Sequence, residues 1–312
     1  MKKAFILINT ILLNYVLISC ASGINMANLA TEGIPEIPKR IQERMGQYQN
    51  TRESYFEDWN RDFFNSGGLQ SLQKVLKSQT LKEVPDTDRW ASPIARPGII
   101  MCAGLNYSDH ARESGMDLPS EPVLFMKASN TISGAYDEVT IPKGSQKTDW
   151  EVELGVVLNR DVLYLKDENE AENAIAGYCV VHDLSERDFQ LNREGQWVKG
   201  KSCPGFSPVG PYLVTRDEIE NVMDLQMRLT VNGEVKQSGN TSTMVFNPVH
   251  LVWYISQFMM LEAGDLISTG TPPGVGLGMK PPQFLQNGDV VELGIDGLGS
   301  QKQQFVNLKE SK

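Results

Sequence analysis

Cysteine and basic side chains are both scarce in this sequence of 312 residues. The four cysteines lie far apart and form no CxxC pair, which argues against a zinc ribbon and against a small fold held together by disulfides. Lys and Arg number 29 against 39 Asp and Glu, so the net charge is −10. Because this charge repels a phosphate backbone, nucleic acid is not an expected partner, and an anionic substrate needs a local cation.

Long hydrophobic runs are missing after the first twenty residues, and no later stretch is long enough for a membrane span. Residues 1–20 combine two lysines with an interrupted apolar run, which is typical of a signal segment. The end of this run, Leu17-Ile18-Ser19-Cys20, resembles a bacterial lipoprotein signal and implies a lipid anchor at Cys20. The alternatives are an uncleaved hydrophobic start or translation from Met26, and the chemistry considered below is itself typical of the cytoplasm.

A small helical and linker region is expected over 21–96. Aromatic residues within 55–64 and leucines within 69–76 recur at helical spacing and predict two amphipathic helices separated by Gly67-Gly68. Packing in a core is the favoured role of the aromatic residues, with a ligand site as the alternative. A stretch containing several prolines then predicts a boundary, after which the main domain occupies 97–312.

The main domain is expected to be mixed and mostly β. Short apolar segments bounded by Gly and Pro predict strands, and an alternating segment that runs into Asn232-Gly233 predicts a hairpin. The expected strands cover 99–103, 123–126, 151–158, 175–182, 225–231 and 290–295. One helix is expected over 248–260. Its expected apolar face consists of Val249, Val252, Trp253 and Met260.

Three carboxylates in this domain form a candidate metal site. Glu151 and Glu153 alternate along an apolar strand, so they project from the same face, and a cation would relieve their repulsion. Water on an exposed face would relieve it equally well and is the alternative. Asp183 follows the 175–182 strand, where it is either a third ligand or a helix cap. Three carboxylates without a thiolate favour Mg²⁺ or Mn²⁺ over Zn²⁺.

Three other patterns in the main domain have structural interpretations. His182 points to the face opposite Asp183 and is expected to be a packed, hydrogen-bonded histidine. Residues 185–188 have the spacing of a capping box and predict the start of a helix. The glycines at 274, 276 and 278 are not followed by GK[ST], which excludes a nucleotide site.

Glu151-x-Glu153 followed by Asp183 resembles the metal triad of the fumarylacetoacetate hydrolase family. The resemblance extends from about residue 97 to 305 and implies a rolled β-structure with short helices around the metal. It also includes the strings Gly104-Leu105-Asn106-Tyr107-Ser108-Asp109-His110, Gly200-Lys201-Ser202, Pro208-Val209-Gly210-Pro211 and Thr269-Gly270-Thr271-Pro272. Segments 147–154 and 195–202 look most like the subgroup that hydrolyses 2,4-diketo-3-deoxy sugar acids of the L-fuconate and L-rhamnonate type. Residues 1 to about 50 depart from the β-rich N-terminal domain usual in that subgroup.

The resemblance implies catalytic roles for three residues. His110 and Glu113 form a dyad in which Glu113 orients His110 as a general base for water, and their three-residue spacing on a short helix agrees with this role. The alternative for His110 is a surface histidine on a polar loop. Lys201 aligns with the active-site lysine of the family, where it would counter developing negative charge or bind a substrate carboxylate.

Four further residues are expected beside the substrate. Arg187 and Gln190 share a helix face in positions that the family uses for substrate, and structural pairing within the protein is the alternative. Thr271 would present its hydroxyl and N–H to a carboxylate, or form a plain turn. Lys127 is a second candidate for the role of Lys201, with a solvated strand end as the alternative.

The resemblance therefore predicts a hydrolase that depends on Mg²⁺ or Mn²⁺ and cleaves a C–C bond of a 2,4-diketo acid to pyruvate and a small hydroxy acid. It also implies a homodimer. One alternative is an isomerase or decarboxylase of a keto diacid with the same fold. The other is a surface-anchored binding protein without activity, which would have no use for the dyad of His110 and Glu113.

Overall fold

The computed structural model describes residues 58–78, 89–109 and 118–308. Contacts divide the chain into one unit of Met1–Asp88 and a larger unit of Arg89–Lys312. The signal segment with Cys20 and the dyad of His110 and Glu113 lie outside the described residues. Within the described ranges, every helix is too short or too polar to span a lipid bilayer.

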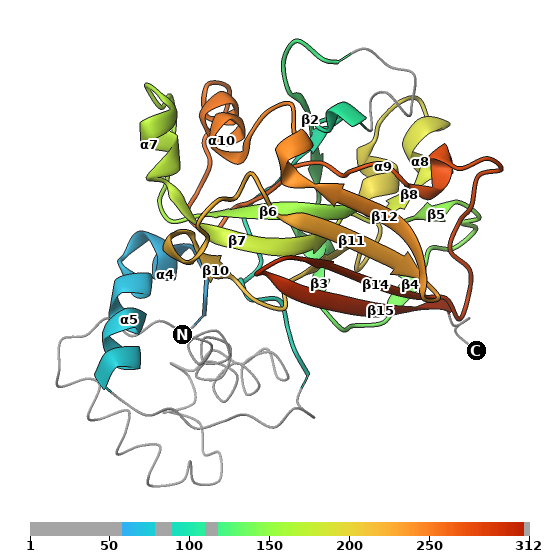
Figure 1. The fold of residues 1–312 in the computed structure, drawn as a ribbon, viewed down its shortest axis with the longest axis horizontal. Coiled ribbons are helices and arrows are strands. Elements are labelled where there is room, and N and C mark those ends of the chain that lie inside the picture. Colours follow the sequence, from blue (N-terminus) through green and yellow to red (C-terminus); the bar gives the residue numbers. More distant parts are fainter. Residues whose placement is uncertain (1–57, 79–88, 110–117, 309–312) are drawn as a thin grey trace, which may run out of the picture. The chain divides into compact units, whose positions relative to one another are not determined.

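The first unit contains two helices, α4 (Arg61–Asn65) and α5 (Gly68–Ser78) (Figure 1). Trp59, Phe63 and Phe64 are buried, and their ring centroids lie 4.4 Å apart for the first pair and 5.1 Å apart for the second. Both predicted helices are present among the described residues, but the first begins only at Arg61, after Trp59, and the second already includes Gly68. The aromatic residues pack against one another, as expected for a core.

Two sheets form the framework of the second unit. The larger has the strand order β2-β1-β13-β6-β7-β9-β3, and β10 pairs with β7 as its eighth strand. These strands are β1 (Ile100–Gly104), β2 (Val123–Lys127), β3 (Ile132–Gly134), β6 (Val152–Leu158), β7 (Ile175–His182), β9 (Ser207–Val209), β10 (Val214–Thr215) and β13 (Leu266–Ser268). Every residue of β6 and β7 is buried, because other elements cover both faces of this central pair.

The second sheet has the order β12-β11-β14-β15-β4. Its strands are β4 (Val139–Ile141), β11 (Gln226–Val231), β12 (Glu234–Asn240), β14 (Val290–Ile295) and β15 (Gly299–Asn307). The predicted hairpin joins β11 to β12, and Asn232 and Gly233 have the positive φ angles of +52° and +83° that a type I′ turn requires.

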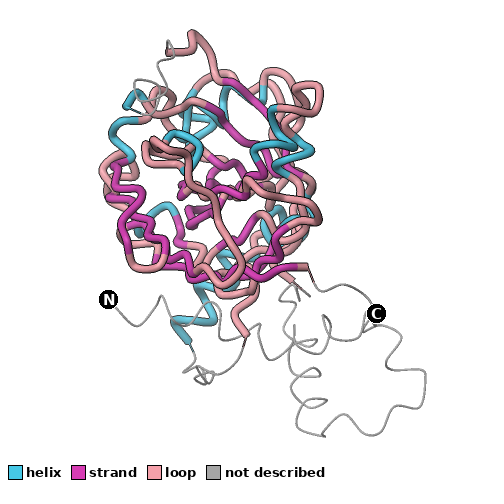
Figure 2. Tube along the Cα trace, turned by 90° about the vertical axis from the view of Figure 1, so that its right-hand side faces the viewer, coloured by secondary structure: helices cyan, strands magenta, loops and turns pink. Residues whose placement is uncertain are grey.

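The two sheets pack against each other around one interior. Strands β11, β14 and β15 contact β6 or β7, and Figure 1 shows β11 and β12 lying across that central pair. Seen from the side, the strands bend around the interior of the unit instead of lying flat (Figure 2).

His182 lies inside, fully buried, and its Nδ1 is 3.0 Å from Oε1 of Gln303 on β15. The packed, hydrogen-bonded role expected for this histidine is confirmed.

Short helices lie around the sheets. They are α7 (Glu168–Glu172), α8 (Arg187–Leu191), α9 (Val198–Lys201) and α10 (Pro248–Ser256), with 3-10 turns η1 (Ser129–Thr131), η2 (Arg216–Glu218), η3 (Thr241–Thr243) and η4 (Gly276–Gly278). Helix α10 packs against α7 and ends four residues earlier than predicted. Its buried face includes Leu251, Val252 and Ile255, whereas Met260 is exposed, so the predicted apolar face was largely wrong.

The helix start predicted at 185–188 is confirmed, but the expected capping box is wrong because Ser185 is not the cap. Ser185 and Glu186 form β8 (Ser185–Glu186), which pairs with β5 (Thr148–Asp149). Helix α8 therefore begins only at Arg187, and the side chain of Glu186 caps it by accepting a hydrogen bond of 2.6 Å from the N–H of Phe189. The pairing of two short strands replaces the first turn of the expected helix.

Candidate metal centre

Three buried carboxylates meet where β6 begins and β7 ends. Glu151 immediately precedes β6, Glu153 lies in it, and Asp183 directly follows β7. The strands are antiparallel, and the N–H of Asp183 donates a 3.0 Å hydrogen bond to the carbonyl of Glu151. One oxygen of each carboxylate lies within 4.8 Å of the other two. Strand register thus brings together the three acids that the sequence predicts as metal ligands.

Lys201 bonds to two of these carboxylates. Its Nζ lies 2.7 Å from Oε2 of Glu151 and 2.6 Å from Oδ2 of Asp183. The preceding Gly200 allows the helix that carries Lys201 to lie close to the backbone of Glu186, because a Cβ on Gly200 would lie 2.3 Å from the carbonyl oxygen of Glu186. Burial disfavours the charged lysine, but Asp183 and Glu151 outweigh burial and raise the pKa of Lys201 above its ordinary value. The lysine therefore stays cationic inside the cluster.

Lys127, the last residue of β2, is 2% exposed, so the interpretation as a solvated strand end is wrong. Its Nζ donates to Oδ1 of Asp183, to the carbonyl of Leu184 at 3.0 Å and to the carbonyl of Phe206 at 2.7 Å. These acceptors account for all three N–H bonds of the ammonium group. Lys127 therefore neutralises Asp183 from within the protein.

Arg187 reaches the cluster from α8. It donates through Nη2 to Oε1 of Glu151 and through Nε to Oδ2 of Asp149, both at 2.7 Å, and through Nη1 to Oε1 of Gln190 at 3.0 Å. Asp149 was not expected at the site, and it also accepts hydrogen bonds from two backbone N–H groups at η4. The signal for it was available, because Asp149, Glu151 and Glu153 continue one alternation of acids along the chain.

Glu153 differs from its neighbours in the partners it bonds. Within the described ranges its hydrogen bonds come from neutral donors, the hydroxyl of Ser268 at 2.5 Å and the N–H of Gly270 at 2.9 Å, both to Oε2. Burial, followed by the negative charges of Asp183 and Glu151, raises the pKa of Glu153 to about 8. Without a metal, the cluster therefore favours a proton on Glu153 at neutral pH, where a bound cation would favour the carboxylate. Ser268 was not expected at the site.

The donor set fits a hard divalent cation. Burial alone would raise the pKa of Glu151, but Lys201 and Arg187 outweigh it and lower that pKa, which keeps this ligand ionised. All three candidate ligands are carboxylates, the oxygen donors that Mg²⁺ and Mn²⁺ prefer. An oxygen that accepts one hydrogen bond keeps a second lone pair for a metal. These residues could therefore hold either ion.

The other expected site residues have different surroundings. The hydroxyl of Thr271 donates to the carbonyl of Val152 at 2.9 Å, so in this structure it binds the protein. Asn106, from the string that ends at His110, donates to the carbonyls of Thr269 at 2.8 Å and Phe246 at 2.9 Å. It thereby links that string to the segment that follows β13.

A curled β-structure that holds a buried cluster of three carboxylates is typical of enzymes that bind a divalent metal ion. Residues 99–306 match the family model described as fumarylacetoacetate (FAA) hydrolase C-terminal. Because this match covers well over half of the chain, the protein belongs to that family. The expected family and the mostly β fold are confirmed.

Relatives agree with this assignment. A Burkholderia ambifaria protein, whose name suggests a hydrolase without giving a substrate, is 50% identical over 80% of this chain and 88% of its own. The structure of 2-hydroxyhepta-2,4-diene-1,7-dioate isomerase from Mycobacterium marinum is 33% identical over 70% of this chain and 78% of that one, with a TM-score of 0.61. The structure of maleylpyruvate hydrolase from Sphingobium, in complex with manganese(II) and pyruvate, is 25% identical over 80% and 84%, with a TM-score of 0.65.

Proposed function

We propose that this protein is a Mg²⁺- or Mn²⁺-dependent hydrolase that cleaves a C–C bond of a 2,4-diketo acid, releasing pyruvate and a second acid. A 2,4-diketo-3-deoxy sugar acid is the substrate we favour, which makes the second product a small hydroxy acid. The observation that carries this proposal is the buried group of Glu151, Glu153 and Asp183 with the ammonium of Lys201 between two of them. The similarity to a hydrolase described with manganese and pyruvate supports it.

Three residues of this chain, His110, Glu113 and Lys201, have separate tasks in the proposed reaction. When bound, a divalent cation would supply positive charge that stabilises the negative charge developing on the substrate oxygens. His110, oriented by Glu113, takes a proton from water, and the oxygen attacks the distal carbonyl. The bond between that carbon and C3 then breaks, its electron pair forms the enolate of pyruvate, and a proton completes the ketone. Lys201 offsets the negative charge as the enolate forms.

The products distinguish this reaction from its alternatives. Purified protein with Mg²⁺ is incubated with a panel of 2,4-diketo acids, and the products are identified by mass spectrometry. We expect pyruvate and a second acid in equal amounts. Carbon dioxide, or an isomerised diacid without chain cleavage, would instead establish the isomerase or decarboxylase alternative, which the similarity to the Mycobacterium marinum isomerase favours.

Replacing Lys201 by methionine is expected to lower turnover by about 10² to 10³, because the positive charge that offsets the enolate is lost. The affinity for Mn²⁺ should stay the same or increase, since the change removes a cation from beside Glu151 and Asp183. Steady-state kinetics and calorimetric titration with Mn²⁺ measure the two effects. Lys199→Met is the matched control, because Lys199 lies on the same helix with its Nζ on the carbonyl of Arg193. Turnover of Lys201→Met equal to that of this control would remove Lys201 from the mechanism.

The assembly and location of the protein remain separate proposals. The family resemblance favours a homodimer, and the segment that ends at Cys20 favours a lipid anchor. Mass spectrometry of the native N-terminus tests the anchor, and sedimentation of the purified protein tests the dimer.

A further inference from the structure

Gln237 is a fully buried polar residue on a strand whose other residues are exposed or half-buried. It lies on β12, an edge strand of the second sheet, and it is the one residue of that strand classed as buried, with 0% exposure. Between β11 and β12 the pairing passes from Leu229 opposite Gln237 to Thr230 opposite Val235, so Lys236 is an additional residue. This is a β-bulge, which changes the direction of neighbouring side chains.

The amide of Gln237 connects the two segments that carry Glu153 and its donors. Its Oε1 accepts a 2.9 Å hydrogen bond from the N–H of Val152, the residue between the two glutamates. Its Nε2 donates to Oγ1 of Thr271 and to the carbonyl of Pro272, both at 2.8 Å. Thr271 closes the link by donating to the carbonyl of Val152. Both backbone polar groups of Val152 are therefore held by this pair of side chains.

The segment just before Thr271 holds the side chain of Glu153. The Oε2 of Glu153 accepts hydrogen bonds from the hydroxyl of Ser268 and from the N–H of Gly270, one residue before Thr271. Strand β12 also approaches this segment closely, because a Cβ on Gly239 would lie 2.4 Å from the Cβ of Pro272. A shift of Gln237 would therefore move both the backbone at Val152, next to Glu153, and the segment that donates hydrogen bonds to Glu153.

We infer that Gln237 is a positioning residue for the metal centre: it sets the spacing of Glu151 and Glu153 and the aim of Glu153 without contacting metal or substrate. This inference rests on the proposed metal-dependent function. A buried amide suits this task because it accepts and donates at once and stays neutral, so it adds no charge near the carboxylates. Residues that hold metal ligands in place commonly change metal affinity by about 10- to 100-fold when replaced.

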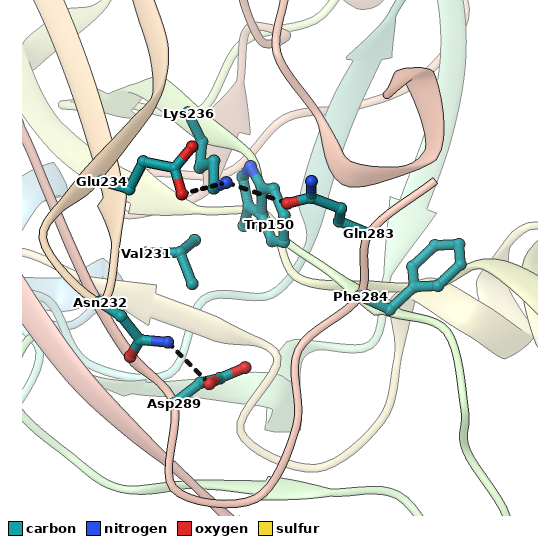
Figure 3. A pocket seen from close by; sticks show the side chains of 8 residues that line it. All are labelled: Trp150, Val231, Asn232, Glu234, Lys236, Gln283, Phe284 and Asp289. Atoms are coloured by element: carbon teal, nitrogen blue, oxygen red, sulfur yellow. Dashed lines mark hydrogen bonds and ion pairs between the residues drawn. The ribbon is translucent and has the colours of Figure 1, made fainter. Parts of the chain in front are cut away.

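The adjacent residue provides a matched control. Lys236 lines a pocket of about 230 Å³. Its Nζ lies 2.9 Å from Oε2 of Glu234 and 2.9 Å from Oε1 of Gln283, and both interactions are drawn as dashed lines in Figure 3. Lys236 thus shares the bulge with Gln237 but bonds to residues outside the acidic cluster. Lys236→Met tests disturbance of the bulge alone.

The experiment titrates the purified full-length protein with Mn²⁺ in a calorimeter, without substrate. Gln237→Met removes all three hydrogen bonds at nearly constant volume, and Gln237→Glu keeps the acceptor for Val152 while replacing the donor. We expect the Kd for Mn²⁺ to rise about tenfold or more in both variants, and to stay within about twofold of wild type in Lys236→Met. Because no substrate is present, an incorrect substrate assignment leaves this result unaffected.

A purely structural role for Gln237 gives a different result. In that case the melting temperature of the metal-free protein would fall, while the folded variants would bind Mn²⁺ with the wild-type Kd. This result in either variant would overturn the inference, as would an equal loss of Mn²⁺ affinity in Lys236→Met. If Gln237→Met does not fold, the Kd of Gln237→Glu decides the matter.

Discussion

Replacing Glu153 by alanine is expected to abolish Mn²⁺ binding and turnover together. The remaining acids, Glu151 and Asp183, bond to Lys201, and Asp183 also bonds to Lys127, so the cluster would no longer carry an excess of negative charge. A hard divalent cation would then meet two carboxylates already neutralised by lysines, which is a poor site for it. Calorimetric titration with Mn²⁺ and product assays measure both losses.

The control for this change is Glu220→Ala, which removes a carboxylate from an exposed position. Like Glu153→Ala, it removes one glutamate side chain, but from outside the acidic cluster, and it should leave the Kd for Mn²⁺ unchanged. If Glu153→Ala bound Mn²⁺ and turned over substrate as well as Glu220→Ala does, the three acids would not be the metal ligands.

Replacing His110 by alanine is expected to lower turnover by about 10² to 10⁴ while the affinity for Mn²⁺ is kept, because the change removes the general base and no proposed metal ligand. Since the sequence contains three histidines, one of them can serve as a close control. His250 lies on α10, where its Nδ1 is 2.9 Å from Oε1 of Glu168 and its ring stacks on Phe246. His250→Ala should therefore keep wild-type turnover.

Single-turnover assays with Mn²⁺-loaded protein compare the two histidine variants. A rate for His110→Ala equal to that of His250→Ala would exclude the dyad from the mechanism. Loss of Mn²⁺ binding in His110→Ala would contradict the account in another way, because His110 would then support the metal centre and not the attacking water.

The sequence was sufficient for the central strands and the acids they carry. The apolar runs that predicted strands at 175–182 and 290–295 match β7 and β14 at both ends. Glu151 and Glu153 could be placed together because alternation along a strand is a local property. Strands of two or three residues, such as β5 and β8, are too short to show a period and were missed.

Burial by distant elements could not be predicted in the same way. Lys127 ends a short strand and Gln237 lies in a polar segment, so both have the local sequence of exposed residues. Lys127 is buried because Leu184 and Phe206, far along the chain, supply its acceptors. Gln237 is buried because its side chain points toward Val152 and Thr271, beside a bulge in the pairing of β12 with β11. Such contacts depend on tertiary pairing that no local pattern encodes.

The most direct test of the account is a crystal structure of the protein grown with Mn²⁺, with anomalous diffraction data measured near the manganese absorption edge. We expect one strong anomalous peak bounded by carboxylate oxygens of Glu151, Glu153 and Asp183. A peak elsewhere, or none at full Mn²⁺ saturation with the three carboxylates still grouped around Lys201, would contradict it.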